Sequence, residues 1–222
     1  MDFSFCIITD GSDLAKERIK EIIKSIELLN IPNYEILCIG GNNLFDDIKN
    51  NNFKKYNFDE TIKYAWITKK KNDIAKLSKY KNLVIFHDYY LFDLDWYTQY
   101  LNIKDEFEDC DICLNPIFLQ NGARDYVDWV TWDHPVFGKQ KSINYDNKNL
   151  IKHQYISGGY FLVKKEFFLK NKLNEELTAG QEEDVEWSLR IRNFAKIIFN
   201  KNSHVRHNKQ HRHMYVMPDI IG

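Results

Sequence analysis

The chain has 222 residues and a formal net charge of −1, with 28% charged and 44% hydrophobic residues. This length and composition predict a single globular domain, and the lack of a basic excess argues against an electrostatic nucleic-acid binder. No apolar run approaches the roughly 20 residues that a membrane span needs. The opening MDFSFCIITD lacks the basic start and long apolar stretch of a signal peptide.

Four cysteines bear on compartment and metal binding. Cys6 and Cys38 lie in apolar, strand-like runs and read as small core residues. Cys110 and Cys113 form a C-x-x-C pair, but a zinc site normally needs a second ligand pair, and no matching pair is evident. Their period-2 placement in DCDICLN favours a strand. Cysteines in this setting favour a reducing compartment, so we expect a cytoplasmic protein.

The first segment predicts a β-α-β unit. Residues 3–8 are an apolar strand candidate, and the turn that follows places Ser12 where its side chain can cap a helix. Residues 34–41 read as a second strand that ends on two glycines. A helix of this length between two strands favours a parallel pair with a right-handed crossover. Between the strands, apolar residues recur at helical spacing until Pro32: Ala15, Ile19, Ile22, Ile23, Ile26 and Leu29.

The remaining chain continues to alternate between strand and helix patterns. Residues 42–65 and 120–154 are weakly patterned and read mainly as loops, and KKKN at residues 69–72 reads as a basic turn. The alternation predicts an α/β fold with one open, mostly parallel central sheet flanked by helices. Strands are expected at 83–87, 111–118, 160–164 and 195–200, and helices at 73–80, 93–102, 165–170 and 183–193.

Polar residues follow several of the predicted strands directly. In open α/β sheets, ligands bind at the carboxyl ends of the strands, so these residues are expected to converge on one site. The convergence does not by itself identify the ligand. The residues concerned are Thr9, Asp10 and Gly11, then Gly40 and Gly41, then His87 and Asp88, and the tail after residue 200.

Two of these segments suggest phosphate binding. A carboxylate at a strand end, such as Asp88, can bind a hard cation that in turn binds phosphate oxygens, although an aspartate can equally start a turn. The lysines of residues 69–71 precede a predicted helix, and cations beside a helix N-terminus favour a phosphate. A solvated basic turn explains the same lysine run.

Three further features lie in the second half. Gly158 and Gly159 let the backbone approach a ligand closely, or they form a simple turn. The acidic run at residues 182–186 suits a helix N-terminus through the helix dipole, and it can also supply a general base. Histidines at positions 204, 207, 211 and 213 can complete a metal site or belong to a disordered tail.

Three pieces, in this order, carry a resemblance to a known family. They are VIFHDYYLFDLDW at residues 84–96, SGGYFLVKKEFF with NEEL and GQEEDVEWSLR between residues 157 and 190, and SHVRH at residues 203–207. The second piece is the specific one. Together they resemble glycosyltransferases of the GT-A fold, particularly the family 2 type and the polypeptide N-acetylgalactosaminyltransferases. Residues 42–65 and 120–154 are outside the likeness.

The resemblance implies a role for each segment. Asp88 would hold Mn²⁺ or Mg²⁺ with His207, and Asp184 would be the base of an inverting transfer, with Glu183 beside it. Trp132 and Asp133 lie in an uncovered stretch and are candidates for an acceptor platform, or for core and loop positions. Donor-binding residues would be Thr9, Asp10, Gly11, Gly40, Gly41, Lys71, Asn72, His87, Asp88, Gly158 and Gly159.

The sequence departs from the family pattern in two places. His87 and Tyr89 occupy positions where the family usually has acids, or an acid and a histidine. Either Asp88 has taken over the metal role, or metal binding is weak or absent. Gly40 and Gly41 stand where family 2 enzymes commonly carry an acid that reads the base, which leaves the base open.

The resemblance thus implies a single glycosyltransferase-like domain over residues 1–222. Residues 1–115 would bind a nucleotide sugar such as a UDP-sugar, residues 116–200 would hold the hydroxyl acceptor (a carbohydrate, glycan or protein), and residues 201–222 would close over the diphosphate. One alternative is a sugar-1-phosphate nucleotidyltransferase, although TDGSDLAKER lacks the glycine run usual in those enzymes. The other is a carbohydrate- or nucleotide-sugar-binding protein without catalysis.

Overall fold

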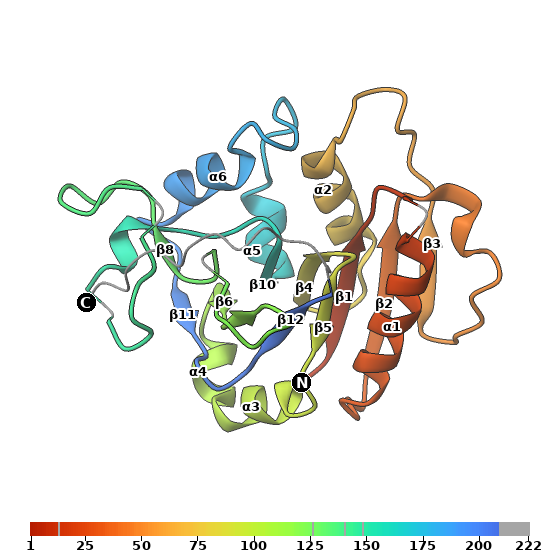
Figure 1. Ribbon diagram of the computed structural model, residues 1–222, viewed down its shortest axis with the longest axis horizontal. Helices are drawn as coiled ribbons and strands as arrows, with labels where there is room; N and C mark the ends of the chain where they lie inside the picture. The colour runs from red at the N-terminus through yellow and green to blue at the C-terminus, as the bar shows by residue number, and fades with distance from the viewer. Residues whose placement is uncertain (13, 126, 140, 148, 209–222) are drawn as a thin grey trace.

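The structure is a computed structural model that describes residues 1–12, 14–125, 127–139, 141–147 and 149–208 (Figure 1). The long strands are β1 (Phe3–Ile8), β2 (Tyr34–Ile39), β3 (Phe53–Tyr56), β4 (Asn82–His87) and β10 (Tyr160–Lys164). The short strands are β5 (Tyr90–Phe92), β6 (Ile112–Leu114), β7 (Ile117–Phe118), β8 (Val130–Thr131), β9 (Gln154–Tyr155), β11 (Ile197–Phe199) and β12 (Val205–His207). The α-helices are α1 (Ala15–Glu27), α2 (Ile67–Leu77), α3 (Trp96–Asn102), α4 (Lys104–Glu108), α5 (Lys165–Lys170) and α6 (Glu183–Ile191), and the 3-10 helices are η1 (Asn42–Phe45) and η2 (Ile151–His153).

The central sheet has seven strands in the order β11-β6-β10-β4-β1-β2-β3. β1 pairs in parallel with both β2 and β4, and β2 pairs in parallel with β3. β10 runs antiparallel to its two neighbours, β4 and β6. The mostly parallel α/β sheet and its opening parallel pair are therefore confirmed, and the antiparallel β10 lies in the middle of the sheet.

Both faces of the sheet are covered, which explains why its inner strands β1, β2, β4 and β10 are mostly apolar rather than alternating. On β1, Phe3, Phe5 and Ile7 pack into the core that contains the apolar side of α1. Cys6 and Ile8 point to the opposite core, which contains residues of α2 and α6. The alternation follows from the two-residue period of a strand.

A smaller, three-stranded sheet in the order β5-β12-β7 holds the segment that follows residue 200. β12 pairs antiparallel with β5 and parallel with β7, which brings His207 opposite Tyr90. Arg206 donates two hydrogen bonds to the Asp93 carboxylate, at 2.7 and 2.9 Å. Residues 205–207 are therefore an ordered strand beside the end of β4. The predicted tail histidines His211 and His213 lie outside the described residues.

Several local predictions were wrong. Residues 69–72 lie inside α2 rather than in a turn, and Ser12 does not cap α1 with its side chain. The strand predicted at 111–118 is split into β6 and β7. All four cysteines are buried free thiols, as predicted for Cys6 and Cys38; of the C-x-x-C pair, Cys113 lies on β6 and Cys110 just before it. No helix in the described part of the chain has the length and apolar character needed to cross a membrane.

Candidate functional site

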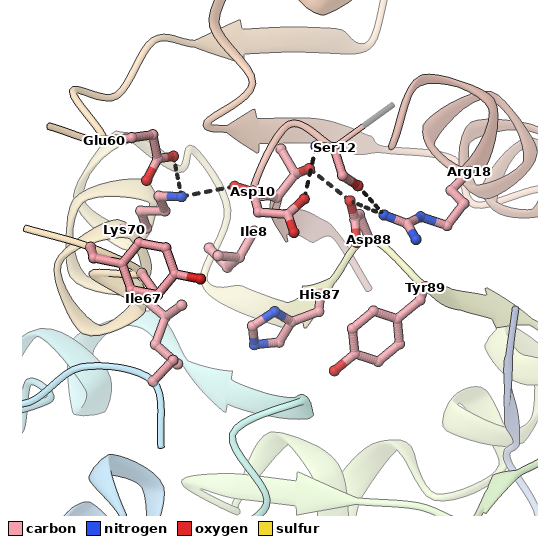
Figure 2. A pocket seen from close by; sticks show the side chains of 14 residues that line it. Ile8, Asp10, Ser12, Arg18, Glu60, Ile67, Lys70, His87, Asp88 and Tyr89 are labelled. Atoms are coloured by element: carbon pink, nitrogen blue, oxygen red, sulfur yellow. Dashed lines mark hydrogen bonds and ion pairs between the residues drawn. The ribbon is translucent and has the colours of Figure 1, made fainter. Parts of the chain in front are cut away.

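A cavity of about 440 Å³ opens at the carboxyl ends of β1 and β4, where the sequence predicted a ligand (Figure 2). Thr9, Asp10, His87 and Asp88, all predicted donor residues, line it. The other lining residues come from the end of β1 and the loop after it, from the turn after β4, from helices α1 and α2, and from two surface loops: Ile8, Ser12, Arg18, Glu60, Tyr64, Ala65, Ile67, Lys70, Tyr89 and Ala179.

Asp88 is bonded to two partners on neighbouring elements. Its Oδ2 atom accepts a 2.7 Å hydrogen bond from the Thr9 hydroxyl and a 3.1 Å hydrogen bond from Nη2 of Arg18. Burial raises the pKa of Asp88, while Thr9 and Arg18 act in the opposite direction. The end of β4 is thereby fixed to the loop after β1 and to the first turns of α1 (Figure 2).

Asp10 and Ser12 shape the loop after β1. The backbone N–H of Ser12 donates to Oδ1 of Asp10 at 2.9 Å, and the Ser12 hydroxyl accepts from Nη2 of Arg18 at 3.1 Å. Burial opposes ionisation of Asp10, but the hydrogen bonds from Ser12 and the charge of Arg18 lower the pKa of the carboxyl below its usual value. Asp10 is therefore an ionised group at neutral pH on the cavity wall.

Lys70, Lys71 and Asn72 of α2 point to different places because each residue turns about 100° around the helix axis. Lys70 lines the cavity, donates to the Thr9 carbonyl at 2.8 Å and pairs with Glu60. Lys71 instead donates to the Gly158 carbonyl at 2.7 Å. The Asn72 amide bonds the backbone of Leu173. Lys71 and Asn72 therefore do not line the predicted donor pocket, and Lys70 does.

The predicted glycines at the ends of β1 and β2 lie behind the cavity rather than on its wall. A Cβ added at Gly11 would be 2.6 Å from the Cα of Gly41, and one at Gly40 would be 2.3 Å from the Thr9 carbonyl oxygen. Gly11, Gly40 and Gly41 also have positive φ angles of 72°, 102° and 69°. Glycine is thus required for these two loops to pack directly against each other.

Two surface loops are joined beside the cavity. The indole N–H of Trp66 donates to the Glu175 carbonyl at 2.7 Å, and the Thr68 hydroxyl donates to the Leu177 carbonyl at 2.7 Å. The Thr178 hydroxyl donates back to the Tyr64 carbonyl at 2.8 Å. These bonds connect the weakly patterned stretch before α2 to the segment that leads into α6, so both contribute to the cavity wall.

A second cavity, of about 310 Å³, lies at the start of α6. Its wall contains Glu183 and Asp184, the predicted catalytic residues, and Trp132, a predicted acceptor residue; the rest is Tyr155, Gly180, Glu182 and Val185. Glu182, at the helix start, has a positive φ of 55°. A non-glycine residue in this conformation carries backbone strain, which occurs often at functional sites.

The loop at residues 157–159 is hydrogen-bonded to one lining residue of each cavity. The Gly159 carbonyl accepts a 3.0 Å hydrogen bond from the backbone N–H of His87, next to the first cavity. The Gly158 N–H donates at 2.8 Å to Oδ2 of Asp184, in the second. A Cβ at Gly158 would be 3.0 Å from Nζ of Lys71 and 3.1 Å from the Asp184 Cβ, so the glycine lets the loop pack closely against these two side chains; the predicted approach to a ligand stays a prediction.

Lys71 and Glu183 are a buried cation and a buried acid on this side of the loop. Burial lowers the pKa of Lys71, and the charges of Glu183 and Asp184 oppose that shift. Burial raises the pKa of Glu183, Lys71 lowers it, and Asp184 raises it further. The charge of Lys71 therefore acts on the acidic start of α6 rather than on the first cavity.

Of the two predicted acceptor residues, Trp132 and Asp133, only Trp132 lines the second cavity. Trp132 lines the second cavity, with Nζ of Lys139 4.2 Å from the centroid of its ring. The Asp133 carboxylate instead accepts from both Nη atoms of Arg192, at 2.8 and 2.5 Å. Asp133 therefore holds the β8 segment against the end of α6 and is not among the residues that line the cavity.

The metal site implied for Asp88 and His207 does not fit the donor atoms present. Nε2 of His207 lies 2.6 Å from Oδ2 of Asp125, and its ring stacks on Tyr89 with centroids 5.2 Å apart. Asp88 is bonded to Thr9 and Arg18. Across residues 1–208, leaving out the undescribed positions, no three His, Cys, Asp or Glu side chains form a group that could hold a metal ion.

Arg18 is a cavity residue that sequence reasoning missed, and Lys70 lies in the lysine run 69–71 considered for phosphate binding but was not singled out from it. Arg18 lies three residues after Ala15 and four before Ile22, within the apolar stripe of α1. Lys70 and Lys71 hold the equivalent places between Ile67 and Ile74 on α2. A cation at an apolar-stripe position is the available signal, since such a side chain must be buried and needs a partner.

Comparison with known proteins supports the fold. No family model matches the sequence, and no curated protein matches it. Staphylococcus aureus TarS aligns with a TM-score of 0.66 at 12% identity over 94% of this chain and 37% of that one. Its residues 1–349 in complex with UDP-GlcNAc give 0.66 at 13% identity, over 96% and 60%. GalNAc-T7 with UDP, GalNAc and Mn²⁺ gives 0.61 at 17%, over 97% and 46%.

These neighbours are glycosyltransferases of the GT-A type, and the fold of this chain is GT-A-like. The fold that the sequence resemblance implied is therefore confirmed. The chain spans between 37% and 60% of the length of these three structures.

Proposed function

We propose that this protein is a glycosyltransferase that moves a sugar from a nucleoside-diphosphate sugar, with UDP-sugars as the first donors to test, to a hydroxyl acceptor. One observation carries the proposal: the loop at residues 157–159 joins the cavity at the β1 and β4 ends to Asp184. The first cavity would hold the donor and the second the acceptor. The reacting atoms would then meet beside Gly158.

Asp184 is the proposed general base. One of its carboxylate oxygens accepts from Gly158 N–H at 2.8 Å and the other from Val185 N–H at 2.9 Å, which fixes the orientation of the carboxylate. It would take the acceptor proton as the acceptor oxygen attacks the anomeric carbon and the C–O bond to the diphosphate breaks. Such a single displacement from the face opposite the leaving group inverts the anomeric centre.

Aromatic side chains of the second cavity favour a carbohydrate acceptor. Trp132 and Tyr155 both line it, with ring centroids 5.3 Å apart, and flat aromatic faces suit sugar rings. Glu182 and Glu183 supply carboxylates that can accept hydrogen bonds from hydroxyl groups. A sugar hydroxyl is thus the acceptor class that this wall accommodates best.

The Asp184→Asn variant tests the proposal. Its amide oxygen can still accept from Gly158, but it cannot take a proton, so release of UDP from UDP-GlcNAc should fall by roughly 100-fold or more. The Kd for UDP should stay within about threefold. Glu186→Gln, on the same helix and paired with Arg190, is the matched control and should keep wild-type turnover.

UDP release by Asp184→Asn within a few-fold of wild type would remove Asp184 as the base. Binding of UDP-GlcNAc by the wild type without any turnover, across a panel of sugar acceptors, would favour a non-catalytic binding protein. Pyrophosphate release from UTP and a sugar 1-phosphate would instead indicate a nucleotidyltransferase.

A further inference from the structure

We propose that Arg18, rather than a divalent cation on Asp88, neutralises the diphosphate of the donor in the first cavity. The inference rests on the proposed function, because it concerns how the donor is held. It assigns Arg18 as a substrate-binding residue and makes donor binding independent of metal.

The Arg18 guanidinium lies beside Asp88, where it competes with a metal ion for the carboxylate. Its Nη2 atom is 3.1 Å from Oδ2 of Asp88, and the two side chains are only 16% and 7% exposed. The same oxygen also accepts from Thr9. Since a fixed positive charge this close repels a second cation, the carboxylate that the resemblance makes a metal ligand is already neutralised by the protein.

The guanidinium also keeps donors for a ligand. Within the described residues, its hydrogen bonds come only from Nη2, to Asp88 and to the Ser12 hydroxyl. Its Nη1 atom makes no hydrogen bond among those residues. A guanidinium carries five N–H groups and binds phosphate oxygens through charge-assisted hydrogen bonds. A phosphate in this cavity would accept from Nη1 while Nη2 keeps its bonds to Asp88 and Ser12.

The charged side chains of the cavity predict how each of them affects the affinity for a diphosphate. Lys70, paired with Glu60, lies at the end of the cavity away from Arg18 (Figure 2). Asp10 and Asp88 add negative charge on the wall between them. In this arrangement Arg18 attracts a diphosphate, whereas Asp88 orients Arg18 but repels the ligand. A metal-binding Asp88 would have the opposite effect on affinity.

The test measures the Kd of UDP by calorimetry in EDTA and in MnCl₂. Wild-type affinities in the two buffers should agree within about threefold. Arg18→Met should weaken binding by about 10- to 100-fold in both, since it removes charge-assisted hydrogen bonds. Asp88→Asn, whose amide oxygen can still accept from Thr9 and Arg18, should bind as tightly as wild type or up to about tenfold tighter.

Lys24→Met is the matched control, because it removes one exposed cation from the same helix, and it should bind like wild type. Binding that requires Mn²⁺, or that Asp88→Asn abolishes, would overturn the inference while leaving the proposed function in place. Wild-type affinity in Arg18→Met would also overturn it. If UDP bound in neither buffer, the proposed function would fall as well. Should Arg18→Met not fold, the wild-type and Asp88→Asn measurements still decide.

Discussion

Lys71 is a fully buried cation that, among the described residues, donates a hydrogen bond only to the Gly158 carbonyl. Gly158 links Lys71 to Asp184, because its carbonyl accepts from Lys71 and its N–H donates to the Asp184 carboxylate. Burial raises the pKa of the neighbouring Glu183, and the charge of Lys71 lowers it. We therefore assign Lys71 to the proposed acceptor side, where it positions the loop and favours ionised carboxylates.

Replacing Lys71 with methionine should raise the pKa of Glu183 further. The direction follows because the variant keeps the burial, and keeps the charge of Asp184, but loses the cation that opposes both. Carboxyl ¹³C chemical shifts followed through a pH titration would measure it. Lys76→Met, an exposed lysine on the same helix, should leave the Glu183 titration unchanged, and an unchanged pKa in Lys71→Met would refute the assignment.

Residue-level expectations agree with the structure where the signal is local in sequence. Thr9, Asp10 and Asp88 follow strands directly and line the first cavity, and Asp184, in a recognisable acidic run, lines the second. Their roles stay predictions. Arg18 was missed, and Lys70 was not distinguished from its neighbouring lysines, because the side of a helix that faces the sheet is set by packing. The bond from the Asp133 carboxylate to Arg192, far along the chain, could not be read from the local sequence either.

At the level of elements, the loops after β1 and β2 pack against each other behind the first cavity through direct contact of Gly11 and Gly41. The sequence indicated glycines near the ligand but not their contact, since the two loops are 30 residues apart. Packing between these loops holds Thr9 and Asp10 in place. A side chain at either glycine must separate them.

Gly11→Ala should lower the free energy of unfolding by about 2–4 kcal/mol, from the left-handed backbone together with the clash against Gly41. Gly122→Ala is the matched control, because its φ of 82° is similar but an added Cβ would contact nothing within 4 Å. Gly122→Ala should lower the free energy of unfolding by about 1–2 kcal/mol. Urea unfolding measures both, and equal losses would show that the contact between the loops contributes nothing.

At the scale of the whole molecule, the hydrophobic pattern was enough to predict a mostly parallel α/β sheet with the site at its carboxyl edge. It could not place β10 antiparallel between β4 and β6, because strand order is set by packing between distant segments. The same limit applies to residues 42–65 and 120–154. Those stretches contribute Glu60 and Tyr64 to the first cavity and Trp132 to the second.

The proposed function depends on the arrangement of the two cavities around one loop. A crystal structure of the Asp184→Asn variant with UDP-GlcNAc tests it most directly, because slow turnover would preserve the donor. We predict UDP in the first cavity, with diphosphate oxygens within hydrogen-bond distance of Arg18 and the anomeric carbon facing residue 184 beside Gly158. A nucleotide bound outside this cavity, or a sugar directed away from residue 184, would contradict the account.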